Sequence, residues 1–146
     1  MKFSDGLWLN QRGYEVNYAV QAYETKITSN SITVFATPTA IWNRGMTLGG
    51  VCLEITYTST APDVIKVTIR HHKGAVDNRP KFELNEDQGY TPEITQGEGF
   101  VEMKSGETVL RIKQGTDWEV SFSRNGKYLT GGAWRATTIV NESQFK

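Results

Sequence analysis

The two histidines of the chain, His71 and His72, are adjacent, and they are the first side chains to test for metal binding or proton transfer. They end a segment, residues 64–72, in which apolar and polar residues alternate as in a β-strand. Neighbouring side chains on a strand point to opposite faces, so the pair cannot chelate one metal ion together. We expect His71 to face the core, with a hydrogen bond at its rim, and His72 to face the other way, before Gly74 ends the strand. The histidines therefore favour a structural role, and no metal site is predicted.

A cysteine can act as a nucleophile when a neighbouring base or positive charge lowers the pKa of its thiol. The single cysteine, Cys52, lies between Val51 and Leu53 in another alternating segment, residues 51–59. Because its neighbours in this predicted strand are apolar, we interpret Cys52 as a small packed side chain.

Acidic side chains are concentrated in one stretch, residues 81–99, and two of them could in principle form the carboxylate pair of a glycosidase. The stretch has the composition of a solvated connecting segment, and its spacing fixes no distance between any two carboxylates. We therefore predict no catalytic residue here. The acidic residues considered are Glu83, Glu86, Asp87, Glu93 and Glu98.

Tryptophan rings can stack on sugar faces, which makes them the remaining candidates for binding chemistry. Trp118 alternates with Val120 and Phe122, and we expect it in the core. The carbohydrate-contact candidates are the three tryptophans near predicted turns, Trp8, Trp42 and Trp134. Burial or packing is the favoured interpretation even for these three, because large aromatic side chains dominate the cores of small sandwiches.

The elements that position these residues are predicted to be β-strands throughout. No stretch of about 11 or more residues has apolar side chains at the i, i+3, i+4, i+7 spacing of a helix. Residues 51–59 and 64–72 are expected to pair across a turn at Pro62, and residues 22–28 and 31–37 across Ser29 and Asn30. Asn125-Gly126 predicts a tight turn late in the chain. The pattern indicates about eight to ten strands in an antiparallel β-sandwich or barrel. The residues expected to face the core are Val51, Leu53, Ile55 and Tyr57 in the first of these strands, and Ile65, Val67 and Ile69 in the second.

Composition limits the class of protein. The 146 residues suffice for one domain, and 16 Lys plus Arg balance 16 Asp plus Glu, so no net charge attracts nucleic acid or an anionic membrane. The chain has no apolar run long enough to span a bilayer, and its first residues lack the apolar stretch of a signal peptide. With one cysteine, no internal disulfide forms. We expect a cytoplasmic protein without a cofactor, a nucleic-acid partner or a membrane partner.

Three stretches together resemble the start of bacterial α-xylosidases of glycoside hydrolase family 31. They are "MKFSDGLWLNQRG" (residues 1–13), "TIRHHKGAVDNRP" (68–80) and "MKSGETVLRIKQGTDWEVSFSRNGKYLTGG" (103–132). The "SDGLWL" segment is similar to the corresponding segment of the family's α-xylosidase branch. The third stretch is similar to the family's N-terminal β-sandwich domain. With gaps, the resemblance runs over nearly the whole chain.

The resemblance implies that residues 1–146 form a single N-terminal domain, a galactose-mutarotase-like supersandwich incomplete at its C-terminal end. In that family a (β/α)8 barrel follows and carries two catalytic aspartates, one of them in a Trp-x-Asp-Met-Asn type of segment. This sequence contains no such segment. The resemblance therefore implies a fragment of a longer glycosidase that is inactive alone, packs on the barrel and helps to shape the active-site mouth.

Two functions from different classes stay open. The preferred hypothesis is the non-catalytic domain of an α-xylosidase, whose partners are the barrel of the same parent chain and the parent's carbohydrate substrate. The alternative is an autonomous carbohydrate-binding module, which a groove of exposed tryptophans with polar neighbours would favour. We also expect an exposed sheet edge or apolar surface, and with it a possible homo-oligomer.

Overall fold

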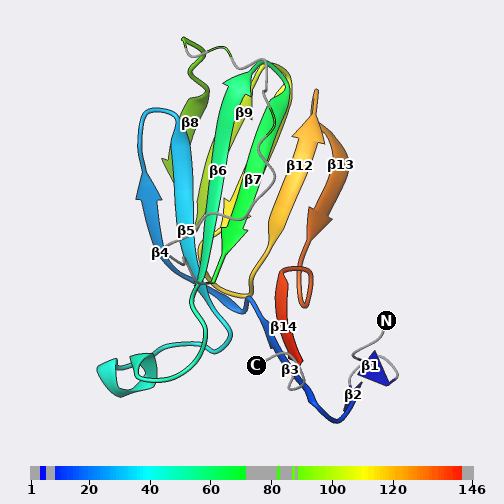
Figure 1. The fold of residues 1–146 in the computed structure, drawn as a ribbon. Coiled ribbons are helices and arrows are strands. Elements are labelled where there is room, and N and C mark those ends of the chain that lie inside the picture. The colour runs from blue at the N-terminus through cyan, green and yellow to red at the C-terminus, as the bar shows by residue number, and fades with distance from the viewer. Residues whose placement is uncertain (1–3, 6–8, 72–81, 83–86, 88, 143–146) are drawn as a thin grey trace.

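The computed structural model describes residues 4–5, 9–71, 82, 87 and 89–142. In this part of the chain two five-stranded antiparallel sheets face each other, and no α-helix is present (Figure 1). The prediction of an all-β antiparallel sandwich is therefore confirmed.

The first sheet has the strand order β11-β4-β5-β6-β7. Its strands are β4 (Gln21–Ile27), β5 (Ser31–Thr37), β6 (Leu53–Ala61), β7 (Val64–Arg70) and the short β11 (Gly115–Thr116). The expected pairs, β4 with β5 and β6 with β7, are both present.

The second sheet has the order β13-β12-β10-β9-β8. Its strands are β8 (Glu93–Gly97), β9 (Phe100–Ser105), β10 (Thr108–Lys113), β12 (Val120–Arg124) and β13 (Lys127–Gly132). The turn between β12 and β13 consists of Asn125 and Gly126, both with positive φ, of 50° and 74°. This is the backbone of the predicted tight turn, because Asn and Gly adopt positive φ at low cost.

The core lies between the inner faces of the two sheets, where alternate residues of four strands interdigitate. Each fully buried aliphatic side chain contributes roughly 1.5–3 kcal/mol relative to exposure. The largest buried side chains are Ile32 and Val34 of β5, Leu53 and Ile55 of β6, Val101 and Met103 of β9, and Leu110 and Ile112 of β10. Trp118, just before β12, is 3% exposed and joins this core as expected.

The edge strand β7 departs from the prediction. In the register of the sheet Ile69 lies opposite Ile55, and Val67 opposite Tyr57, so these side chains project from the same face. Ile55 is 1% exposed, whereas Val67 and Ile69 are 43% and 51% exposed. The predicted phase is right, but the expected burial of Val67 and Ile69 is wrong, because the facing sheet does not cover this edge. Ile65 alone of the three packs against the core.

Two strand ends also differ from the expectation. β7 ends at Arg70, and His71 follows it as an exposed residue, so the expected place of His71 at the core is wrong. β6 begins at Leu53, so Val51 and Cys52 belong to the preceding loop, and Cys52 is exposed rather than packed. His72 and Gly74 lie outside the described residues.

Two further features project from one end of the sandwich (Figure 1). The first is the β5–β6 loop, residues 38–52, which carries the 3-10 helix η1 (Arg44–Thr47). The second is a ribbon in which β3 (Tyr14–Tyr18) pairs with β14 (Thr138–Glu142). A short pair, β1 (Ser4–Asp5) and β2 (Leu9–Asn10), precedes the ribbon.

Candidate functional site

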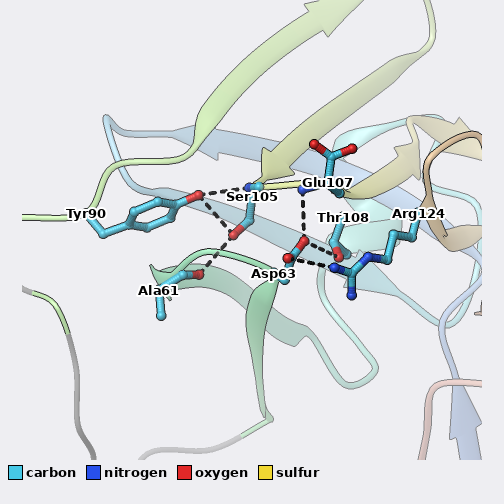
Figure 2. A network of polar contacts seen from close by, with 8 residues as sticks. Ala61, Asp63, Tyr90, Ser105, Glu107, Thr108 and Arg124 are labelled. Atoms are coloured by element: carbon cyan, nitrogen blue, oxygen red, sulfur yellow. Dashed lines mark hydrogen bonds and ion pairs between the residues drawn. The ribbon is translucent and has the colours of Figure 1, made fainter.

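Among the described residues, a dense set of polar contacts lies at the other end of the sandwich, around Asp63 in the β6–β7 turn (Figure 2). Asp63 has a φ of 64°, a left-handed conformation that Asp tolerates better than most residues. Its Oδ1 accepts hydrogen bonds from the backbone N–H of Glu107 at 2.8 Å and from Thr108 Oγ1 at 3.1 Å. Its Oδ2 lies 3.0 Å from Arg124 Nη2. The Glu107 N–H, with help from Thr108 and Arg124, lowers the pKa of the Asp63 carboxyl.

Ser105, at the end of β9, is the second centre of this network. Its hydroxyl donates to the backbone carbonyl of Ala61 at 3.0 Å and lies 2.8 Å from the buried Ser59 hydroxyl. The Tyr90 hydroxyl is 3.2 Å from Ser105 Oγ and accepts the N–H of Gly106 at 3.0 Å. Figure 2 shows how these contacts join the β6–β7 turn of one sheet to the β9–β10 turn of the other.

The chemistry of this network is structural. A serine nucleophile needs a neighbouring general base, usually a histidine or a carboxylate. The hydrogen-bond partners of Ser59 and Ser105 are each other, backbone carbonyls and Tyr90. None of them is a base that could activate a hydroxyl. We therefore describe these contacts as a clamp between the two sheets, and name them the turn clamp.

The carbohydrate-contact candidates lie on separate segments. Trp42 is in the β5–β6 loop and is 74% exposed, and Trp134 follows β13 and is 68% exposed. Neither ring is buried, which contradicts the favoured interpretation for Trp42, whereas Trp134 packs edge to face against Tyr18. Trp8 lies outside the described residues.

The Trp134 ring lies beside a cation and a second aromatic ring. The guanidinium of Arg135 lies 4.3 Å from the centroid of the Trp134 ring and 5.2 Å from that of Tyr18. The rings of Tyr18 and Trp134 meet edge to face at 6.5 Å. Such cation–π contacts hold the indole in place while leaving much of its surface to solvent.

The acidic candidates are also dispersed. Glu93 lies in β8, Glu98 in the turn after it, and Asp87 accepts the N–H of Gly89 at 2.9 Å. Glu83 and Glu86 lie outside the described residues. Glu98 lines a shallow hollow of about 270 Å³ on the outer face of the second sheet, together with Phe100, Arg111, Lys113 and Glu119.

The cations of this hollow already have partners. Arg111 lies over the Phe100 ring at 3.7 Å and pairs with Glu102 at 3.3 Å, and Lys113 lies 3.6 Å from Asp117. These are exposed pairs of small energetic value. The hollow is thus a mixed-charge surface depression rather than a prepared anion site.

Cys52 is exposed but does not have the setting of a nucleophile. Partial burial, with smaller effects of Glu54 and Glu24, raises the pKa of its thiol. The thiol therefore stays protonated near neutral pH, and only the thiolate is reactive. Among the described residues no group of three or more His, Cys, Asp and Glu side chains could hold a metal ion. No described helix is long and apolar enough to cross a membrane.

Sequence reasoning missed the turn clamp. Asp63 and Arg124 are 61 positions apart, and Ser59 and Ser105 are 46 apart. The local signal was only the turn itself, because a Pro-Asp pair between two strands marks a turn but not its distant partners. The exposed β5–β6 loop was also missed.

The fold and these contacts define a class, an antiparallel β-sandwich whose described polar network is structural. No known protein-family model matches the chain. Its sequence is 32% identical to that of the α-xylosidase XylQ of Lactiplantibacillus pentosus, over 97% of this chain and 19% of that protein. It is 28% identical to an α-xylosidase of Emericella nidulans, over 98% of this chain and 19% of the relative.

These similarities confirm the resemblance to α-xylosidases. The chain corresponds to one domain-sized portion of them, because it spans about a fifth of the length of the curated relatives it matches.

Proposed function

We propose that the chain is the non-catalytic N-terminal β-sandwich domain of a family 31 α-xylosidase that hydrolyses α-xylosidic bonds in carbohydrate metabolism. In this role the sandwich packs on the catalytic barrel of the same polypeptide and helps to shape the mouth of the active site. The observation that carries the proposal is the match of 97% of the chain to only 19% of an α-xylosidase. The proposal includes a cytoplasmic location, which the single cysteine supports.

The described geometry supports the non-catalytic part of the proposal. A retaining glycosidase needs two carboxyl groups about 5–5.5 Å apart on a rigid scaffold. The described acidic candidates Asp87, Glu93 and Glu98 lie on different segments, and Asp63 is occupied by the turn clamp. Binding without extra transition-state contacts accelerates nothing, so residual sugar binding would not make the sandwich an enzyme.

The test compares two purified proteins on a nitrophenyl α-xyloside near neutral pH. One is the 146-residue chain, and the other is the longer polypeptide that contains it. We expect release of nitrophenol by the longer polypeptide and none above the buffer blank by the chain alone. Turnover by the chain that disappears when Glu83, Glu86, Asp87, Glu93 or Glu98 is changed to the corresponding amide would overturn the proposal.

An autonomous carbohydrate-binding module is the second candidate, and the exposed Trp134 ring beside Arg135 is the observation that favours it. Calorimetric titration of the chain with xylo-oligosaccharides separates the two functions. Binding that Trp134→Ala abolishes and that Trp42→Ala preserves would support the module. The scaffold role predicts no saturable binding by the chain alone.

A further inference from the structure

The β5–β6 loop is much longer than its strands require. β5 and β6 are hydrogen-bonded neighbours, with Ala36 opposite Leu53 at the open end of the ladder. Antiparallel neighbours are usually joined by roughly two to five residues, but here the connection runs from residue 38 to residue 52. Figure 1 shows it reaching away from the sandwich with η1 near its far end. Long ordered loops of this kind in compact domains usually serve a function.

Hydrogen bonds fix the loop at its base and at η1. At its base, Gln21 Oε1 accepts the backbone N–H of Ile41 at 2.7 Å, and Thr37 Oγ1 donates to the Thr39 carbonyl at 2.9 Å. Near its end, Thr47 Oγ1 donates to the Arg44 carbonyl at 2.7 Å. These contacts attach the base of the loop to β4 and close the turn at η1.

The loop presents three large apolar side chains to solvent, among exposed polar residues that include Asn43 and Arg44. Trp42 is 74% exposed, Leu48 is 88% exposed and Met46 is 37% exposed. Arg44 is the only charged residue between Pro38 and Cys52. A hollow of about 150 Å³ at the base, lined by Tyr23, Pro38 and Met46 among others, leaves the inner side of the loop incompletely packed. Large exposed apolar side chains that are close together in sequence are typical of a contact surface.

The chemistry of the loop favours a protein partner over a sugar. A sugar site combines an aromatic ring with hydrogen-bonding side chains that pair the hydroxyl groups. Asn43 and Arg44 follow Trp42 with exposed hydrogen-bonding side chains, whereas Met46 and Leu48 offer an aliphatic surface and a weak thioether acceptor. The combination of tryptophan, arginine and methionine in one exposed loop is instead typical of protein interfaces.

The lengths of the relatives indicate which protein surface the β5–β6 loop contacts. The chain accounts for 19% of each curated α-xylosidase that it matches, so about four fifths of each relative lies outside the matched region. We infer that the β5–β6 loop is the docking arm of this sandwich, and that Trp42, Met46 and Leu48 insert into an apolar surface of the remainder of the same longer polypeptide. This inference rests on the proposed function, since it requires that remainder.

Hydroxyl-radical footprinting tests the inference, because Trp and Met oxidise readily when exposed. The oxidised fractions of Trp42 and Met46 are measured in the dilute 146-residue chain and in the longer polypeptide. We expect at least a five-fold decrease at both residues in the longer polypeptide. Equal oxidation in the two proteins would overturn the inference. Protection that instead appears in the chain alone, on raising its concentration or adding xylo-oligosaccharide, would also overturn it in favour of a second copy or a sugar.

A variant pair supplies the matched control. Trp42→Ser with Leu48→Ser should separate the unfolding of the sandwich from that of the rest of the longer polypeptide, giving an additional transition at lower temperature. Ile27→Ser, at the opposite end of the same sheet and 40% exposed, should not. In the 146-residue chain the double variant should keep its unfolding midpoint within about 3 °C, because both side chains are already exposed. Identical melting of the variant and parent longer polypeptides would contradict the docking role.

The outcomes for docking and for function are distinguishable. If the longer polypeptide cleaves the aryl α-xyloside but leaves Trp42 and Met46 fully reactive, the docking inference fails and the proposed function stands. If the two residues are protected but no xyloside is cleaved, the docking inference stands and the proposed activity fails.

Discussion

At the scale of single residues, Asp63 shows how one side chain can connect two sheets. Its carboxylate accepts hydrogen bonds from Glu107 and Thr108 and pairs with Arg124, while its positive φ lets the β6–β7 turn close. All of these contacts stabilise the ionised form, which explains the lowered pKa. The charge of Asp63 is therefore part of the connection between the turns.

The lowered pKa predicts a pH dependence of stability. A carboxyl whose pKa is lower in the folded than in the unfolded chain adds stability above its unfolded pKa, and loses it as pH falls through the folded value. We expect Asp63→Asn, which keeps the turn conformation accessible, to be less stable than the parent chain above about pH 4. The difference in unfolding midpoint should shrink as the pH falls below the ordinary value of 3.8.

Thermal unfolding of both proteins from pH 2 to pH 7 measures this difference. Glu93→Gln, on the exposed strand β8, serves as the control for removing one carboxylate. A destabilisation by Asp63→Asn that stays constant down to pH 2 would show that the charge of Asp63 is irrelevant to the turn clamp.

At the scale of elements, β7 shows that a pattern can place side chains on the right face without saying what covers that face. Ile55 and Ile69 are directly opposite each other, yet one is buried and the other half-exposed. Alternation depends on the strand alone, whereas burial depends on which distant segments pack against that face. Only the former can be read from neighbouring residues.

This difference predicts unequal costs for two chemically identical substitutions. Ile55→Ala should lower the free energy of unfolding by about 2–5 kcal/mol, because it leaves a cavity in the core. Ile69→Ala should cost less than about 1.5 kcal/mol, since Ile69 has about half of its surface in water already. Urea denaturation of both variants measures the two values, and equal losses would mean that β7 is covered in solution.

How much of the molecule the sequence predicts depends on whether a feature is set by residues close in sequence or by distant segments. The β4–β5 pair and the Asn125-Gly126 turn follow from residues that are close in sequence, and both are confirmed. The end of β7 before His71 and the start of β6 after Cys52 do not follow, because alternation continues past the point where hydrogen bonding stops. The turn clamp and the exposure of Trp42 depend on how distant segments are assembled, which no local pattern contains.

At the scale of the whole molecule, the sandwich has open edges. β7 and β13 each have a neighbour on one side only in their described sheets. β7 also carries the half-exposed apolar side chains Val64, Val67 and Ile69. With 16 positive and 16 negative formal charges, no net charge keeps copies apart. Unpaired apolar edges of this kind template association.

We therefore expect the 146-residue chain to self-associate through β7 at concentrations near about 1 mM. Val67→Lys with Ile69→Lys should restore the monomer, because charged side chains on an edge strand oppose pairing. Trp42→Ser with Leu48→Ser should leave the association unchanged, since it alters only the β5–β6 loop. Sedimentation velocity gives the masses, and a parent chain that stays monomeric at this concentration would refute the expectation.

The two strands of the β3–β14 ribbon are synthesised at widely separated times, so β3 forms its ladder late. Tyr14 and Glu142, whose side chains are hydrogen-bonded, are 128 positions apart. At about 5–20 residues per second, Tyr14 is made roughly 6–26 s before its partner. Hairpins such as β4–β5 close within roughly 1–10 μs once both strands are free. β3 therefore stays without its partner strand far longer than β4 or β5, and it is exposed to neighbouring nascent chains for that whole interval.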